Sequence, residues 1–225
     1  MHPKKQDWSR LRVFPLEQRR SLTRAEEILV SPDADPKPLP SEQQQAVALC
    51  ARQILEARDK GADVVLMYGA HLLRNGAALI LHRMMQRGWL SHLATNGAGT
   101  IHDWEYAWLG RSTESVEQYV AAGSFGAWDE TGRNIHLALL AGALRGDGYG
   151  VSLGRFIAEN GADFPSRDSL VEAIRANPAD PLTAARADLL QAIDLHGAPQ
   201  GRYTVQHRWP QASILAAAYS HGVPM

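Results

Sequence analysis

Leu93-Ala94-Thr95-Asn96-Gly97-Ala98-Gly99-Thr100-Ile101-His102-Asp103 is the stretch that points to the fold. An apolar segment leads into a loop with two glycines, and a helix is predicted to start at Thr100. Thr100 as N-cap, with Asp103 three residues later, approximates a capping box. Exposed backbone N–H groups between a strand and a helix N-terminus can bind phosphate or another anion. The same pattern also fits a plain turn in which glycine only supplies an unusual backbone conformation.

The residues before this stretch predict a strand–helix–strand unit. Residues 63–68 form an apolar run of strand length, residues 75–87 have apolar side chains at helical spacing, and residues 89–94 form a second strand. A strand that is apolar on both faces is typical of a parallel sheet covered by helices on both sides. The loops at residues 68–76 and 95–103 would then face one crevice at the carboxyl ends of the strands, where open α/β sheets bind ligands.

The chain divides into an arm, residues 1–40, and an α/β domain, residues 41–225. Residues 23–30 can form a short helix, while four prolines in residues 31–40 predict an extended linker. We expect the arm to pack on the main domain or on a neighbouring subunit. The domain begins with a capping box at Ser41 and Gln44, followed by a helix that ends at Gly61. Further helices are predicted at residues 112–123, 135–144, 152–161, 166–177, 182–196 and 211–220.

The last residues, 221–225, have the pattern of a turn and the first residues of a further strand. Two strands are too few for the sheet that this pattern predicts. Either another subunit supplies the missing strand or the chain is a fragment, and we expect the fragment.

Composition excludes several classes of protein. A hydrophobic content of 45%, a charged content of 21% and a formal net charge of −1 describe a globular protein with no nucleic-acid or membrane partner. No apolar run approaches the ~20 residues of a membrane span, and the N-terminus lacks the apolar region of a secretory signal. The single cysteine, Cys50, fits a reducing cytoplasm and is interpreted as a small buried hydrophobic residue on the first helix of the domain.

The residues around the glycine loop allow two interpretations, a dinucleotide-binding motif and a metal site. Gly97 to His102 matches half of a dinucleotide fingerprint, but His102 occupies the third glycine position and no acidic residue follows at the expected distance. An ordinary Rossmann dehydrogenase is therefore disfavoured. Alternatively, His71, His102 and Asp103 converge at one sheet edge, with His136 as a further ligand, and hold zinc or non-haem iron. His82 and His136 equally fit exposed positions on helix surfaces.

The two loops resemble those of the deoxyhypusine synthase family. Its motifs S-N-L-x-S-x-G and T-T-A-G-G-x-x-E-D correspond here to residues 70–76 and 95–103, and the similarity covers about residues 60–110, with a looser match towards residue 225. It implies a Rossmann-like, largely parallel sheet flanked by helices, and NAD bound between the loops at a subunit interface of a homo-oligomer, a dimer or a tetramer. It implies NAD contacts from Ala70, His71, Arg74, Thr95, Asn96, Gly97, Ala98, Gly99, His102 and Asp103.

The resemblance also implies an activity. The family transfers the aminobutyl group of spermidine to a lysine, with NAD accepting hydride from the amine carbon to leave an imine that the lysine captures. We therefore expect an NAD-dependent transferase that uses a polyamine or related amine and modifies an amine or a protein lysine.

This chain departs from the family at several positions. Ala70, His71 and Arg74 replace the family's polar residues in the first loop, and His102 replaces a glutamate. The family's catalytic lysine segment lies further along than residue 225, so no catalytic residue is assigned. Two alternatives stay open. One is a non-catalytic nucleotide-binding or assembly protein of the same fold, and the other is a metal-dependent hydrolase that uses His71, His102 and Asp103.

Overall fold

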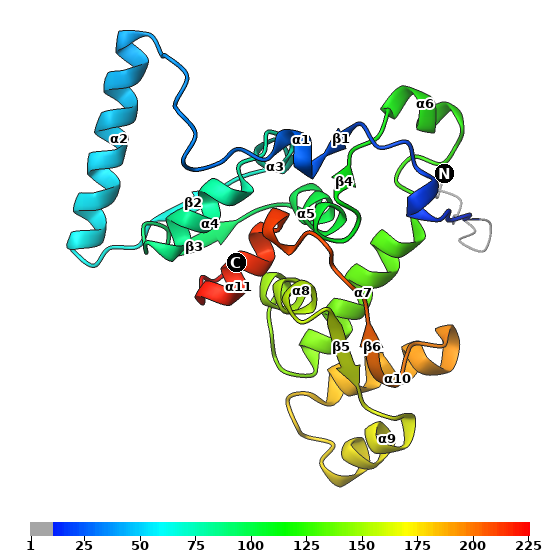
Figure 1. Cartoon of the computed structure of the whole chain (residues 1–225). Helices are drawn as coiled ribbons and strands as arrows, with labels where there is room; N and C mark the ends of the chain where they lie inside the picture. Colours follow the sequence, from blue (N-terminus) through cyan, green and yellow to red (C-terminus); the bar gives the residue numbers. More distant parts are fainter. Residues whose placement is uncertain (1–10) are drawn as a thin grey trace, which may run out of the picture.

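The computed structural model describes residues 11–225. It is a mixed α/β structure, mostly helical, with three two-stranded sheets in that range (Figure 1). The strands are β1 (Thr23–Arg24), β2 (Val65–Met67), β3 (His92–Ala94), β4 (Arg111–Ser112), β5 (Gly161–Phe164) and β6 (Gly201–Thr204). The helices are α1 (Ala25–Ile28), α2 (Ser41–Asp59), α3 (Ala70–Arg74), α4 (Ala78–Gln86), α5 (Gly97–Leu109), α6 (Val116–Ala121), α7 (Asp129–Ala143), α8 (Tyr149–Ala158), α9 (Arg167–Ala176), α10 (Thr183–His196) and α11 (Ile214–His221), with 3-10 turns η2 (Leu16–Gln18) and η3 (Pro210–Ala212).

The predicted strand–helix–strand unit is confirmed. β2 and β3 pair in parallel, with Leu66 opposite Leu93, and α3 and α4 lie between them in the sequence. Leu93 is buried, and its side of the sheet packs against residues of α4 and α11, including Leu81, Met85, Ile214 and Ala217.

The predicted extent of the sheet is wrong. Among the strands of residues 11–225, β2 and β3 are the one parallel pair, so a large Rossmann-like sheet is absent from this part of the chain. Val65 and Met67 are 52% and 75% exposed, which shows that helices cover one face of β2 and not both. The unbroken apolar run therefore did not indicate burial on both faces.

A second core lies on the other side of α5. Trp104 and Ala107 are buried, and Trp108 stacks on Trp104 with ring centroids 5.2 Å apart. The antiparallel strands β5 and β6 join the same core but were not predicted from the sequence. Their glycine-containing segments of four residues carry too little period-two alternation to be recognised.

Several helix starts differ from the predicted ones. α5 begins at Gly97, because Asn96 rather than Thr100 caps it. α2 begins one residue early, after Pro40, with no side-chain cap, so the predicted capping box is wrong. Ser112 lies in β4 while Ser115 caps α6, and Ser152 lies inside α8. The predicted starts of α9 and α10, and the end of α11 at Gly222, are correct to within a residue.

The described part of the arm packs on the main domain. Residues 1–10 lie outside the described residues. β1 pairs with β4, and Phe14 N–H donates to the Ala127 carbonyl at 2.8 Å. Residues 31–40 contain turns and extended backbone but no helix or strand, as predicted. At the other end of the chain, Leu93 N–H donates to the Pro224 carbonyl at 2.9 Å, so the last residues run beside β3.

α2 stands apart from the two cores (Figure 1). None of its residues is buried, and Cys50 is exposed, so the interpretation of Cys50 as a buried residue is wrong. Its apolar side chains Val47, Leu49 and Leu55 are exposed and meet no core within the described chain. Within residues 11–225, no helix combines the length and the apolar character needed to cross a bilayer.

Candidate functional site

A cavity of about 410 Å³ opens at the carboxyl end of β3. Two hydrogen bonds fix its loop: the Asn96 side chain accepts from Gly99 N–H at 3.0 Å, and Thr95 Oγ1 donates to the Tyr68 carbonyl at 2.9 Å. A side chain at Gly99 would overlap Thr95, so glycine is required there for packing. The cavity is lined by His92, Leu93, Ala94, Thr95, Asn96, Gly97, Thr100, Tyr149, Gly150 and Met225.

Two helices begin at this cavity. α5 starts at Gly97 and α8 starts at Tyr149, and both residues line the cavity. A helix N-terminus carries a partial positive charge and N–H groups without partners inside the helix. The hydroxyls of Thr100 and Tyr149 lie 3.0 Å apart, one from each helix. The arrangement therefore favours an anionic group with several acceptor oxygens.

Three of the ten predicted cofactor-binding residues line this cavity: Thr95, Asn96 and Gly97. Ala98 is exposed beside them, and Gly99 is buried beneath. Sequence reasoning missed Tyr149, which lies far along the chain between two predicted helices. The glycines around Tyr149 were the only local sign of this role, because a glycine-containing turn that precedes a helix often forms an anion-binding site.

The segment predicted as the first ligand-binding loop, residues 68–76, does not line the cavity with its residues 70–74. Residues 70–74 are the short helix α3, and Ala70, His71 and Arg74 are absent from the cavity lining. His71 and Arg74 are exposed. The two loops are nevertheless close, because a Cβ atom built on Gly69 would lie 3.6 Å from Asn96 Nδ2. The prediction that the two segments are neighbours is therefore confirmed, and Ala70, His71 and Arg74 do not line this cavity.

Asp103 has a structural role in this arrangement. Its carboxylate is fully buried, and it accepts hydrogen bonds from Ser213 Oγ and from Ile214 N–H, the latter at 2.6 Å. These donors lie at the start of α11, so Asp103 ties α5 to that helix. Burial raises the pKa of the Asp103 carboxyl to about 7, although the hydrogen bonds oppose this shift. The side chain is absent from the lining of this cavity.

His102 also turns away from the cavity. Its Nδ1 atom lies 2.6 Å from Ser112 Oγ and 3.8 Å from Glu105 Oε2. Glu105 in turn accepts two hydrogen bonds from Arg19, at 2.8 and 2.7 Å. Burial alone would raise the pKa of Glu105, but the bonds from His102 and Arg19, with the charge of Arg19, lower it to about 2. His102 therefore belongs to a buried polar cluster that fastens the arm to α5.

The predicted metal site is not formed. His71 is exposed on α3, His102 contacts Ser112, and Asp103 contacts α11. His136 Nδ1 lies 2.7 Å from the carbonyl of Gly132 on its own helix. No group of three or more His, Cys, Asp or Glu side chains within residues 11–225 is arranged to hold a metal ion. The predicted convergence of His71, His102 and Asp103 is therefore wrong.

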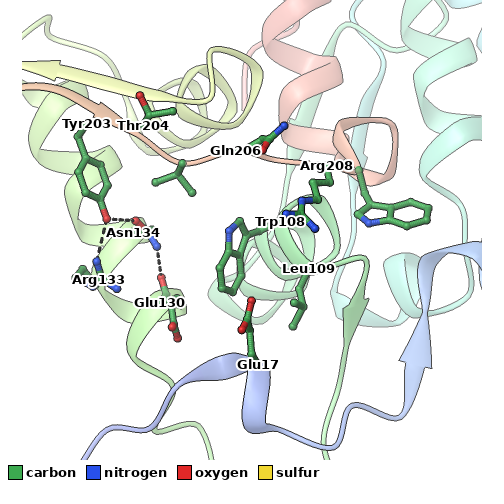
Figure 2. A pocket seen from close by; sticks show the side chains of 12 residues that line it. Glu17, Trp108, Leu109, Glu130, Arg133, Asn134, Tyr203, Thr204, Gln206 and Arg208 are labelled. Carbon is green, nitrogen blue, oxygen red and sulfur yellow. Dashed lines mark hydrogen bonds between the residues drawn. The ribbon is translucent and has the colours of Figure 1, made fainter.

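A second cavity, of about 450 Å³, lies between α5, α7, η2 and the segment that follows β6 (Figure 2). Trp108 stands near its centre, and the Tyr203 hydroxyl, bound by Arg133 at 2.9 Å, donates to Asn134 Oδ1 at 3.0 Å. The amide of Asn134 then donates to the Glu130 carbonyl at 2.8 Å. These polar atoms already satisfy one another. This wall therefore presents few free groups to a ligand, and none of the predicted cofactor-binding residues lies there.

Comparison of the chain with protein-family models, with curated proteins and with solved structures finds no match.

Proposed function

We propose that the cavity at the end of β3 binds the pyrophosphate of a nucleotide, with NAD as the expected nucleotide. One observation carries the proposal: the N-termini of α5 and α8 meet at a cavity beside the carboxyl end of a parallel strand pair. Its volume of about 410 Å³ lies in the ordinary range for ligand sites. The identification of NAD rests on the resemblance of the two loops to the deoxyhypusine synthase family.

The donors at the cavity fit a pyrophosphate. Asn96 already uses the Gly99 N–H, which leaves the N–H groups of Gly97 and Ala98 at the start of α5 for ligand oxygens. The Tyr149 hydroxyl adds a further donor, whereas the Thr100 hydroxyl already donates to the Gly97 carbonyl at 3.0 Å. None of these groups carries a full charge, so affinity would depend on backbone donors and on the two helix ends.

The expected activity is the NAD-dependent transfer of an aminobutyl-type group from a polyamine to an amine or a protein lysine. When bound, NAD supplies a hydride acceptor. The residues of this chain would bind the nucleotide and orient it, and no catalytic residue is assigned. His92 and Tyr149 are the only lining residues with titratable side chains. That scarcity favours a second candidate, a nucleotide-binding protein of the same fold without catalysis.

The substitution Gly97→Leu tests the site without disturbing the packing. A Cβ atom at Gly97 meets no atom within 4 Å, so the longer side chain can extend into the cavity. Gly132→Leu in α7 is the matched control, because a Cβ atom there also meets nothing within 4 Å. Both changes raise helix propensity by a similar amount. We expect Gly97→Leu to weaken NAD binding about tenfold or more, which is ~1.4 kcal/mol, and Gly132→Leu to leave it unchanged.

Isothermal titration with NAD, ADP-ribose and inorganic pyrophosphate gives the measurement. Equal affinities for NAD in wild type and Gly97→Leu, or no binding of any of the three probes, would remove the proposed site. Incubation with spermidine and NAD then separates the two candidates. Formation of NADH supports the transferase, whereas NAD binding without NADH supports the non-catalytic protein.

A further inference from the structure

The second cavity, between α5, α7, η2 and the segment that follows β6, holds charged groups that the proposed nucleotide site does not use. Its volume of about 450 Å³ lies in the ordinary range for ligand sites. No residue that lines it also lines the cavity at the end of β3. A ligand bound here would therefore occupy a separate site from the proposed nucleotide.

One wall of this second cavity is held in place by its own hydrogen bonds. The Tyr203 hydroxyl donates to Asn134 Oδ1 at 3.0 Å, and Asn134 is 2% exposed. Arg133 donates to the Tyr203 hydroxyl and to the Asp129 carboxylate, each at 2.9 Å. These bonds fix the shape of the wall without a ligand, which lowers the entropic cost of binding one.

Charged side chains around the rest of the cavity have no ionic partner in the described chain. None of the ion pairs within residues 11–225 includes Glu17, Glu130 or Arg208. Glu17 contacts Arg111 through its backbone carbonyl, at 2.9 Å, and that bond does not use the Glu17 carboxylate. Glu130 Oε2 accepts a hydrogen bond from Leu16 N–H at 2.7 Å. The cavity therefore presents carboxylate oxygens and a guanidinium group that a ligand can bind.

Trp108 supplies an apolar surface among these charges. Figure 2 shows the side chains of Glu17 and Arg208 on different sides of the Trp108 indole, and all three residues line the cavity. Trp108 stacks on the buried Trp104 with ring centroids 5.2 Å apart, which holds the indole in place. An aromatic face of this kind binds an apolar group by stacking and by burial of its surface.

Charges of both signs that are not paired with each other favour a ligand that itself carries both signs. A small zwitterion can place its ammonium group at Glu17 and its carboxylate at Arg208, whose planar guanidinium matches a carboxylate. The lining holds two carboxylates and two guanidinium groups, so its formal charges also balance. A ligand of one sign would leave groups of the other sign without a partner. We propose that this cavity binds a free α-amino acid with an apolar side chain that lies against Trp108.

Three probes of matched shape test this recognition in isothermal titrations of the full chain. L-Phenylalanine carries both charges, phenethylamine lacks the carboxylate, and 3-phenylpropionate lacks the ammonium group. We expect L-phenylalanine to bind, and each analogue to bind about tenfold more weakly or worse. Equal affinity for L-phenylalanine and either analogue would overturn the proposal, because one of the two charges would then not be recognised. Absence of L-phenylalanine binding would overturn it as well.

Two substitutions with matched controls test which side chains recognise the two charges. Glu17→Gln removes one negative charge, and Glu117→Gln does the same at an exposed position outside the cavity. Arg208→Met removes one positive charge, and Arg145→Met is its exposed control. We expect Glu17→Gln and Arg208→Met each to weaken L-phenylalanine binding about tenfold, and the controls to leave it unchanged. Wild-type affinity in both cavity variants would overturn the assignment.

The indole N–H signals in a heteronuclear NMR spectrum give an independent test of location. Trp108→Phe identifies the signal of Trp108 by its disappearance, and it keeps an aromatic ring beside Trp104. We expect titration of wild type with L-phenylalanine to shift the Trp108 signal in a saturable way. Saturable binding that leaves the Trp108 signal unchanged would place the ligand elsewhere and overturn the proposal.

Discussion

Two buried carboxylates on α5 differ in how the protein satisfies them. Asp103 and Glu105 are two residues apart, and both are almost inaccessible to solvent. The Asp103 carboxylate accepts hydrogen bonds only from neutral donors, Ser213 and the start of α11, and burial raises its pKa to about 7. The Glu105 carboxylate accepts two hydrogen bonds from the Arg19 guanidinium, and its pKa is lowered to about 2. Burial alone would raise the pKa of both groups, so the hydrogen bonds from His102 and Arg19, together with the charge of Arg19, reverse the shift at Glu105.

The two clusters also differ in what they join. Asp103 connects α5 to α11 near the end of the described chain, whereas Glu105 connects α5 to the arm. The Glu105 cluster is larger, because Ser112 and Thr131 also donate to that carboxylate. Removal of one partner of a buried ion pair leaves a buried charge without compensation and destabilises the fold strongly. Removal of one partner of a neutral hydrogen bond costs less stability. The following variants are chosen to separate these cases.

The largest effect is expected for Arg19→Met. The side chains of Arg19 and Glu105 are 2% and 1% exposed, so the substitution leaves a buried carboxylate without its cation. The free energy of unfolding should fall by ~3–5 kcal/mol. Arg83→Met is the control, because Arg83 pairs with an Asp33 side chain that is 73% exposed, and a surface pair contributes only ~0–1 kcal/mol. Urea denaturation measures both, and equal losses would contradict the contrast between the buried and the exposed pair.

A second difference is expected in the dependence of stability on pH. The folded pKa of Glu105, about 2, lies below its ordinary value of 4.5, so its contribution is present above pH 4.5 and is lost as pH falls towards 2. The folded pKa of Asp103, about 7, lies above its ordinary value of 3.8, so its contribution is present below about pH 4 and is lost as pH rises to 7. Each of these carboxyl groups changes the slope of the free energy of unfolding against pH by at most ~1.4 kcal/mol per pH unit.

Glu105→Gln should therefore remove part of the loss of stability in acid. Asp103→Asn should remove part of the loss between pH 4 and 7. Urea titrations at pH 3, 5 and 7 compare the two variants with wild type. If both substitutions changed the same part of the pH profile, the opposite pKa shifts of the two carboxyls would be refuted.

The smallest effect is expected for Ser213→Ala. The Ser213 hydroxyl donates to Asp103 and accepts from Ala216 N–H, so it caps α11 while it satisfies the carboxylate. Loss of a helix cap costs ~1 kcal/mol, and the lost bond to Asp103 adds to this cost. Ser166→Ala at the start of α9 removes an exposed cap and is the matched control. Thermal denaturation that shows the same shift for both variants would mean that the bond to Asp103 adds nothing.

Local signals in the sequence were sufficient for some of these features. The periodicity of residues 75–87 and the two flanking apolar runs predicted β2, α4 and β3, because spacing along the chain directly determines which face a side chain occupies. The segment after β3 was located correctly for the same reason, although its glycines lie in the first turn of α5 and not in a loop. Thr95 and Asn96, which the family resemblance named as cofactor-binding residues, do line the cavity at the end of that strand.

Local sequence patterns could not predict the contacts between segments that are far apart in the chain. Asp103 lies in the recognised motif, yet its partners are more than a hundred residues away, so its structural role left no local signal. Nothing near Arg19 indicates that it pairs with Glu105, 86 residues later. Tyr149 reaches the cavity only because α8 packs beside α5, and α3 formed where an open loop was expected. These outcomes depend on tertiary packing, which a pattern in one short segment does not specify.

The position of α5 between its two clusters has a consequence for folding kinetics. The contacts of Glu105 with Arg19 and of Asp103 with Ile214 close loops of 86 and 111 residues on the same helix. The entropy of loop closure grows only with the logarithm of length, so the two closures differ by about 0.2 kcal/mol. Neither end of the described chain therefore has an entropic advantage in docking first. Contacts of such long range slow folding, and α5 is the element on which both ends converge before the native state is complete.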